Sequence, residues 1–265
     1  MYMCLALEAQ KQWLTDPVVK PHIHRTGIIF ACIEAPGLDA DSKARFDGIF
    51  RDGYWAGVTK CTWNPLAGWG DASNALRSVI QAAVNIGVIY VQATATKVVF
   101  DSTGWSSGIA TLEASEICAG KILLCTGAYI PDHPKIQVGD YMVAAASVMC
   151  AFRVPEDQRN KFSNRPIIVH PMGEYPAECI PKSGPGFVKC TQERSFTHKV
   201  FHKTSKQEIS VPPSRVTQQT WSQDVPYGLQ DEAKAVRDKL FGNWIDNMEP
   251  EEYRMCWDAI TPNQD

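Results

Sequence analysis

The segment between residues 71 and 125 constrains the fold most, because it combines one clear helix signal with several short apolar runs. Residues 71–87 predict an amphipathic helix, since apolar side chains recur at helical spacing along one face. Asp71 is a suitable N-cap residue, and Gly87 stands where helices commonly end in a left-handed conformation. We expect strands at the four apolar runs that follow the helix: 88–91, 98–100, 108–112 and 121–125.

The rest of the chain adds helix and strand signals in no regular alternation. We expect helices at 3–14 and 229–244, strands at 26–33, 166–170 and 186–190, an apolar run at 141–152, a helix with a loop at 39–53, and a loop at 202–226. This order predicts a mixed α/β (α+β) fold rather than a repeated strand–helix–strand unit. The 265 residues, of which 45% are hydrophobic, suffice for one large domain or two interleaved ones.

Composition argues against several classes of protein. The formal net charge is -3 and no long basic run occurs, so nucleic acid is not expected as a partner. No apolar run approaches the ~20 residues of a membrane-spanning helix, and the first residues do not form a signal peptide. The cysteines number nine, without a C-x-x-C pair, which argues against a disulfide framework or a zinc ribbon. We therefore expect reduced thiols in an intracellular protein.

Metal chemistry is not expected either. The six histidines show no metal-ligand spacing apart from His22 and His24, which lie in a loop flanked by proline. General nucleotide and hydrolase motifs are also missing from the sequence: G-x-G-x-x-G, the P-loop, G-x-S-x-G and H-E-x-x-H. Residue patterns alone therefore predict a mixed α/β protein and no particular chemistry.

Three segments of the sequence point to a more specific function. Residues 123–131 have the sequence Leu-Leu-Cys-Thr-Gly-Ala-Tyr-Ile-Pro, residues 187–193 have Phe-Val-Lys-Cys-Thr-Gln-Glu, and residues 253–262 have Tyr-Arg-Met-Cys-Trp-Asp-Ala-Ile-Thr-Pro. In this order, and with the helix at 71–87 before them, they resemble FAD-dependent amine and amino-acid oxidases. The resemblance is to the monomeric sarcosine oxidase and fructosyl-amino-acid oxidase (amadoriase) family of the D-amino-acid oxidase superfamily.

The first segment resembles the turn beside the dinucleotide in that family. The resemblance implies cofactor-binding roles for Thr126, Gly127 and Tyr129, and for Lys97 upstream. Glycine at such a turn lets backbone N–H groups approach a phosphate or ribose, because no Cβ stands in the way. The alternative is an ordinary strand and turn in which glycine supplies a positive φ.

The second and third segments resemble the catalytic parts of the family. Lys189 matches a lysine near the flavin that promotes oxygen reduction, where a fixed cation stabilises developing negative charge. Glu193 matches a glutamate that contacts substrate, and residues i and i+4 of a strand face the same side. Cys256 matches the cysteine that carries the flavin covalently, a role that suits a thiolate nucleophile. The alternatives are an exposed Lys/Glu pair and a buried structural cysteine.

The resemblance implies a discontinuous architecture: an incomplete Rossmann-like FAD domain, at 1–26 and 63–137, interleaved with a mixed-sheet substrate domain, at 27–62 and 138–265. The implied reaction is oxidation of the C–N bond of a small amine or amino acid by O2, giving an imine and hydrogen peroxide. Sarcosine-, pipecolate- and fructosyl-amino-acid-like substrates all remain open, as do cytoplasm and peroxisome as compartments.

The sequence also departs from the family. The family opens with a G-x-G-x-x-G unit for the pyrophosphate and continues past the covalent cysteine, so we expect this chain to be truncated at both ends. The strands expected at 88–125 should then lack their central partner, and Cys256 of this chain alone should carry no flavin. Whether the chain is an enzyme is therefore left open. The alternatives are an inactive fragment or gene-model fragment without cofactor, and a binding module.

Overall fold

A computed structural model of the chain describes most of its length. The described residues are 2–32, 58, 60–113, 116–132, 141–163, 165–172, 175–181, 186–203, 205–213, 225–245 and 247–261. The helix and loop expected at 39–53 lie outside them. The described residues belong to two compact units: Met1–Ala83, Ala146–Ser195 and Arg215–Cys256 form unit 1, and Val84–Ala145, Phe196–Ser214 and Trp257–Asp265 form unit 2. The domain boundaries expected from the sequence stay a prediction.

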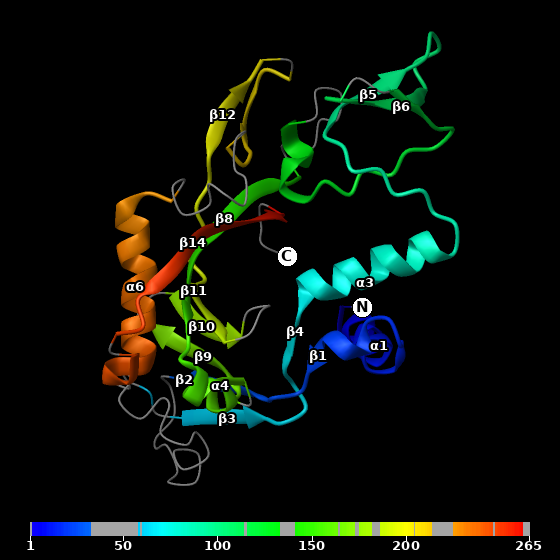
Figure 1. Cartoon of the computed structure of the whole chain (residues 1–265). Helices are drawn as coiled ribbons and strands as arrows, with labels where there is room; N and C mark the ends of the chain where they lie inside the picture. The colour runs from blue at the N-terminus through cyan, green and yellow to red at the C-terminus, as the bar shows by residue number, and fades with distance from the viewer. Residues whose placement is uncertain are drawn as a thin grey trace. The chain divides into compact units, whose positions relative to one another are not determined.

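Unit 1 is built on a mixed seven-stranded sheet (Figure 1). Its strands, in spatial order, are β14 (Pro250–Ile260), β8 (Val143–Arg153), β11 (Phe187–Gln192), β10 (Tyr175–Pro181), β9 (Ile167–Met172), β2 (Ile28–Cys32) and β3 (Lys60–Asn64). The pairs from β8 to β9 are antiparallel, β9 and β2 are parallel, and β2 and β3 are antiparallel. The strands expected at 26–33, 166–170 and 186–190 and the apolar run at 141–152 are confirmed as β2, β9, β11 and β8.

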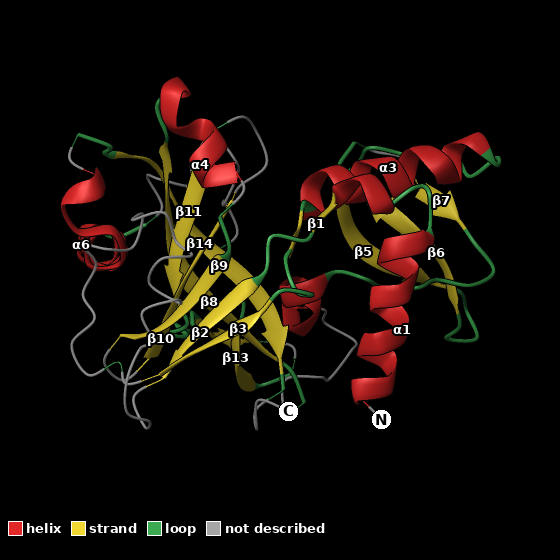
Figure 2. Cartoon of the chain, turned by 90° about the horizontal axis from the view of Figure 1, so that it is seen from below, coloured by secondary structure: helices red, strands yellow, loops and turns green. Residues whose placement is uncertain are grey.

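Helix α6 (Tyr227–Phe241) covers one face of this sheet, and the 3-10 turn η4 (Gly242–Ile245) follows it (Figures 1 and 2). The helix expected at 229–244 is confirmed. The buried face of α6 contains Ala233, Val236, Arg237, Leu240 and Phe241. Phe241 packs edge-on against Phe152 of β8, with ring centroids 5.7 Å apart. The core of unit 1 therefore lies between α6 and the sheet.

The remaining elements of unit 1 lie outside the sheet. They are α1 (Tyr2–Thr15), η1 (Lys20–His22), β1 (Ile23–His24), β4 (Trp69–Gly70), η3 (Glu156–Gln158) and α4 (Arg159–Ser163). The helix expected at 3–14 is confirmed as α1. β1 and β4 form a short antiparallel pair in which His24 stacks on Trp69, with ring centroids 4.1 Å apart.

Helix α3 (Ala72–Asn85) confirms the clearest sequence signal. The Asp71 carboxylate accepts a hydrogen bond from the backbone N–H of Asn74 at 3.2 Å, as an N-cap does. Gly87 adopts φ +98°, the left-handed conformation expected after the helix. Both ends of α3 are thus set by local residues, independent of the packing around them.

At Gly27, both the backbone conformation and the close packing of Trp63 require a glycine. It has φ +81°, and a Cβ at this position would lie 1.9 Å from Cη2 of the Trp63 indole. We expect Gly27→Ala to lower the free energy of unfolding by about 2–5 kcal/mol, since a left-handed alanine costs ~1–2 kcal/mol and overpacking ~1–3 kcal/mol. Gly87→Ala is the matched control, because a Cβ there meets nothing within 4 Å and only the conformational cost remains. Urea unfolding of both variants checks this, and equal losses would contradict the clash.

Unit 2 contains a three-stranded antiparallel sheet and a hairpin. The sheet consists of β5 (Ala95–Phe100), β6 (Ser106–Thr111) and β7 (Glu116–Cys118), and the hairpin of β12 (Lys199–His202) and β13 (Gln207–Ser210). The strands expected at 98–100 and 108–112 are confirmed. β13 lies inside the loop expected at 202–226, so that prediction is wrong there. The side-chain hydroxyl of Ser210 donates a hydrogen bond to the backbone carbonyl of Ala144.

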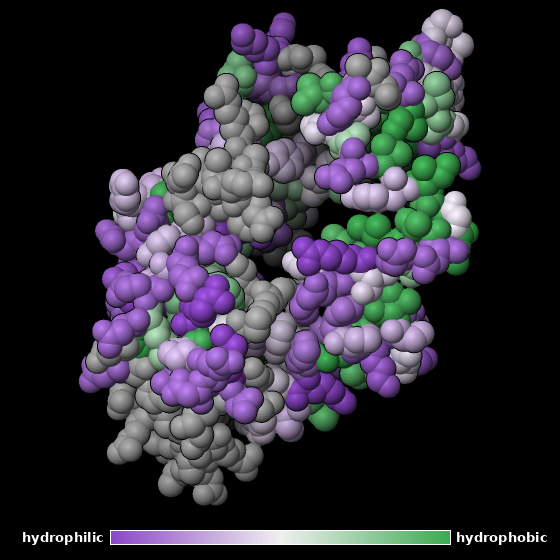
Figure 3. Space-filling model, in the orientation of Figure 1, coloured by the Kyte–Doolittle hydropathy of each residue, from purple (hydrophilic) through white to green (hydrophobic). Residues whose placement is uncertain are grey.

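The strands expected at 88–91 and 121–125 are also wrong. Neither segment forms a strand or pairs with one among the residues that the structure describes. Several of their apolar side chains are exposed to solvent, and Ile89 and Leu123 are each 87% exposed. The hydrophobic surface near the end of α3 in Figure 3 includes the first of these segments. An apolar run becomes a buried strand only when a neighbouring strand pairs with it. The run itself does not show whether such a strand exists.

Candidate functional site

Lys189 lies in the middle of β11, between two strands. Its register partners are Ala151 on β8 and Ile180 on β10. Val188 and Cys190 on either side are fully buried, whereas Lys189 is half-buried. Because side chains alternate along a strand, Lys189 points to the face opposite Cys190. That face of the sheet is the one that α6 does not cover, which we call the open face.

Glu178 on β10 lies near Lys189 on this open face. It follows Ala177 and precedes Cys179, both of which are buried toward α6. Burial raises the pKa of Glu178 above its usual range, the Lys189 ammonium lowers it, and the Glu193 carboxylate raises it further. Glu178 is therefore close to both the Lys189 ammonium and the Glu193 carboxylate. Sequence reasoning missed Glu178, because only the pairing of β10 with β11 brings it beside Lys189.

Glu193 directly follows β11. Its backbone N–H donates to the carbonyl of Pro176 at 2.8 Å, which continues the pairing with β10. Its side chain is exposed. The structure thus brings together Lys189, Glu193 and the additional Glu178, as two carboxylates and one ammonium at one end of the open face.

Cys256 lies on β14, which is separated from β11 by β8 alone. Its thiol is half-buried. Three residues earlier, the pKa of Tyr253 is raised by burial and by nearby Cys150, whose thiol donates to the carbonyl of Ala233 on α6. Strand alternation over three residues puts Cys256 on the side of β14 opposite Tyr253. The strand β14 itself was missed, because the charged residues Glu252, Arg254 and Asp258 interrupt its apolar side chains.

The expected cofactor turn lies in unit 2. Gly127 begins the 3-10 turn η2 (Gly127–Asp132) with φ +53°, and the N–H of Tyr129 donates to the carbonyl of Thr126 at 3.1 Å. Thr126, Gly127 and Tyr129 are all exposed, and a Cβ on Gly127 would meet nothing within 4 Å. Lys97 is exposed on β5, next to a register shift after Ala95. The turn thus leaves backbone open to a ligand, whereas the preceding segment is not the strand expected there.

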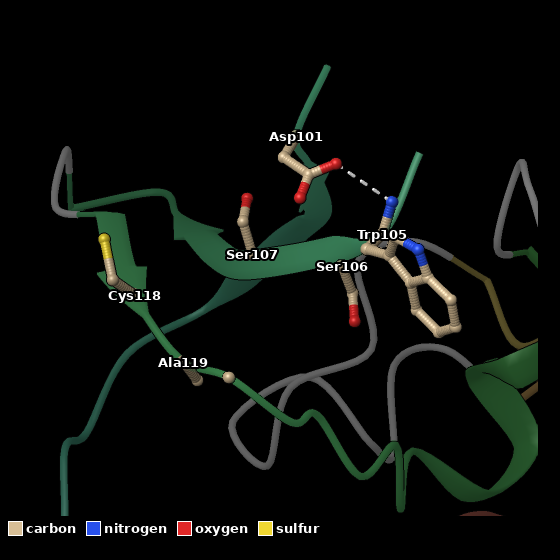
Figure 4. A pocket seen from close by; sticks show the side chains of 7 residues that line it. Asp101, Trp105, Ser106, Ser107, Cys118 and Ala119 are labelled. Carbon is tan, nitrogen blue, oxygen red and sulfur yellow. Dashed lines mark hydrogen bonds between the residues drawn. The ribbon is translucent and has the colours of Figure 1, made fainter. Parts of the chain in front are cut away.

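Unit 2 also has an open pocket of about 610 Å³, built from Asp101, Trp105, Ser106, Ser107, Cys118, Ala119 and Gly120 (Figure 4). The Asp101 carboxylate accepts hydrogen bonds from the hydroxyl and N–H of Thr103 and from the N–H of Trp105. These bonds, led by that of the Thr103 hydroxyl, hold the pKa of Asp101 below its usual range against the opposing effect of burial. Asp101 thus stabilises its own turn, and none of the site residues predicted from the sequence lines this pocket.

The described part of the chain contains no group of three or more His, Cys, Asp or Glu side chains that could hold a metal ion. None of its helices has the length and apolar character needed to cross a bilayer.

Comparison with solved structures finds this fold in fructosyl-amine oxidases. The deglycating fructosamine oxidase from Aspergillus fumigatus (Amadoriase II) gives a TM-score of 0.79 at 20% identity, covering 97% of this chain and 62% of the other. A modified fructosyl peptide oxidase from Aspergillus nidulans gives 0.81 at 21%, covering 98% and 66%. Fructosyl peptide oxidase from E. terrenum gives 0.75 at 20%, covering 97% and 65%.

These likenesses show the mixed α/β fold expected from the sequence, and at such identities they show the fold alone. This chain spans less than two thirds of the length of each of the three solved proteins. No protein-family model matches the sequence, and no curated protein matches it.

Proposed function

We propose that this chain carries the flavin-facing sheet of an FAD-dependent oxidoreductase that oxidises the C–N bond of an amino acid or secondary amine. The observation that carries the proposal is the open face of the seven-stranded sheet. Lys189 lies on this face beside Glu178, and Cys256 lies on β14, which is separated from the strand of Lys189 by β8 alone. Among sarcosine-, pipecolate- and fructosyl-amino-acid-like substrates, the names of the structurally similar enzymes favour a fructosyl amino acid.

The residues of the chain fit such a cofactor. The half-buried Cys256 thiol is accessible enough to be a point of attachment, and the open backbone at Gly127 suits a ribose or phosphate. We assign Thr126, Gly127, Tyr129 and Lys97 to cofactor binding, within an FAD part at 1–26 and 63–137. The substrate part is then 27–62 and 138–265. When bound, FAD would supply the redox chemistry, accepting hydride from the C–N bond and passing electrons to O2.

The roles of the protein side chains follow from charge. The Lys189 ammonium stabilises negative charge that develops as O2 is reduced, because a fixed cation needs no reorganisation at that moment. Glu193, exposed at the end of β11, attracts and orients the amine of the substrate. Glu178 adds a second carboxylate beside Lys189, and its raised pKa reflects burial above all.

Flavin uptake tests the proposal. Purified chain is incubated with FAD and separated from unbound cofactor, and we expect protein-bound visible flavin absorbance that a fructosyl amino acid bleaches without oxygen. Sarcosine and pipecolate serve as competing substrates, and peroxide is measured after air is admitted. A folded chain that takes up no FAD would contradict the proposal and favour the alternative of a cofactor-free fragment.

Covalent attachment gives a separate prediction. In a version of the chain extended at both ends after the fructosyl-amine oxidases and loaded with FAD, we expect flavin to remain attached after acid precipitation, and Cys256→Ser to release it, since a hydroxyl is a much weaker nucleophile than a thiolate. Mass spectrometry of the peptide containing Cys256 measures the attachment. Cys61→Ser, a half-buried cysteine on β3, is the matched control and should keep the flavin. Loss of flavin when the FAD-loaded protein without substitutions is precipitated with acid would show that Cys256 does not attach the flavin.

A further inference from the structure

The face of the sheet toward α6 contains a row of three thiols. Cys150 on β8 is the register partner of Cys190 on β11, and Cys190 is the register partner of Cys179 on β10. All three side chains are fully buried. Cys150 donates its hydrogen bond to the carbonyl of Ala233 on α6 at 3.3 Å, whereas Cys190 donates to Cys179. Cys150 is thus hydrogen-bonded to the helix, and Cys190 is hydrogen-bonded to Cys179.

Cys179 and Cys190 have a geometry that allows a disulfide bond to form. The Sγ atoms of Cys179 and Cys190 are 3.5 Å apart, and a disulfide bond is about 2.05 Å long. Directly opposed residues of antiparallel strands have Cα atoms about 4.5–5.5 Å apart, which lies inside the range of about 4.4–6.8 Å found for disulfides. Side-chain rotation, without movement of either strand, can therefore bring the sulfur atoms into bonding distance.

Arg165 makes the two thiols unequal. Its Nη2 donates to the Cys179 sulfur at 3.2 Å, and only 3% of the residue is exposed. Burial works against a charged thiol, but the hydrogen bond from Cys190 and the positive charge of Arg165 hold the pKa of Cys179 below its usual range. Burial and the neighbouring sulfurs raise the pKa of Cys190 well above its own. The guanidinium beside Cys179 therefore favours this thiol over Cys190 as the nucleophile of the pair.

We propose that Cys179 and Cys190 form a peroxide-reactive dithiol, with Cys179 as the attacking thiolate, Cys190 as the resolving thiol and Arg165 as the cation that positions the thiolate. This site is independent of flavin binding and of the open face. It differs from an inert structural cysteine, because the pair combines a charge partner with a second sulfur within reach.

The reaction is balanced with hydrogen peroxide as the oxidant. The Cys179 sulfur attacks one peroxide oxygen, the O–O bond breaks, and hydroxide leaves to take up a proton as water. The resulting sulfenic acid is attacked by the Cys190 sulfur, the S–O bond breaks, and water leaves with the thiol proton. Two thiols are oxidised to one disulfide, and one peroxide is reduced to two waters. Because both sulfurs are buried, local opening of unit 1 sets the rate of the first step.

Thiol mapping on the folded chain tests this proposal. Reduced protein is treated with hydrogen peroxide, quenched, denatured, alkylated and digested without reductant. We expect a cross-linked peptide pair joining Cys179 to Cys190, which dithiothreitol removes. Cys150→Ala should retain this cross-link, whereas Cys190→Ala should abolish it and leave Cys179 as a dimedone-reactive sulfenic acid. Arg165→Met should slow cross-linking about tenfold or more, because a hydrogen bond from a charged group to the thiolate is lost.

The controls separate this reaction from general oxidation. The exposed thiols of Cys4, Cys118 and Cys125 report the reactivity of ordinary cysteines in the same digest. Circular dichroism confirms that each variant is folded, and Cys190→Ala keeps the test decisive if Arg165→Met does not fold. Two results would overturn the proposal: Cys179 and Cys190 staying reduced while the exposed thiols oxidise, or a cross-link that forms only after denaturation.

Discussion

Replacing Phe241 by alanine is expected to lower the free energy of unfolding by about 3–5 kcal/mol, the cost typical of truncating a buried phenylalanine. The Phe241 ring is fully buried at the C-terminal end of α6. It packs edge-on against Phe152 and lies 5.9 Å from the Phe162 ring, centroid to centroid. The Arg165 guanidinium lies 5.8 Å from the ring centroid. The substitution therefore removes contacts to β8 and α4 at once.

This loss is large because the total stability of a domain is about 5–15 kcal/mol. Denaturant unfolding followed by circular dichroism measures it. Tyr227→Ala on the same helix is the matched control, since Tyr227 is an aromatic residue that is 85% exposed, and its loss should stay within about 0.5 kcal/mol. Similar losses in both variants would show that α6 does not anchor the sheet through Phe241.

The local parts of this fold could be predicted from the sequence. Helix α3 was predicted from its apolar spacing, from Asp71 and from Gly87, and each of these acts within a few residues of itself. The strands at 88–91 and 121–125 were predicted wrongly, because an apolar run reports a tendency to be buried and not the strand that buries it. Ile89 and Leu123 are in solvent for that reason.

The residues of the candidate site show the same difference between local sequence signals and strand pairing. Lys189, Glu193 and Cys256 were predicted from the order of short segments that resemble a known family. Glu178 and the Cys179–Cys190 pair were not found, because strand register brings each beside its partner. Residues ten or more positions apart become neighbours only when β10 folds onto β11, and no local pattern in the sequence encodes that register. The sequence predicts reduced thiols, but it does not show that Arg165 lies beside one of them.

The largest catalytic effect is expected from Lys189→Met in protein loaded with FAD. Methionine keeps the length and packing of the side chain and removes the charge. Removing one preorganised group that stabilises charge in a transition state commonly slows a reaction about 10²–10³-fold. We expect a loss of this size in the oxygen half-reaction, and little change in reduction by substrate, because the ammonium acts only as negative charge develops on oxygen.

Stopped-flow spectrophotometry separates the two half-reactions. The matched control is Lys234→Met on α6, where the ammonium is paired with Glu249 at 2.6 Å on the covered side of the sheet. That variant should reoxidise at the normal rate, since its charge does not lie on the open face. Because Glu178 lies beside Lys189, removing the ammonium should also raise the pKa of this carboxyl further. The Glu178 pKa, followed by carboxyl NMR with Glu178→Gln as the assignment control, shows whether the two charges interact even in protein without cofactor. Reoxidation at an unchanged rate, with the Glu178 pKa raised as expected, would leave Lys189 a surface charge of the sheet and remove it from oxygen chemistry.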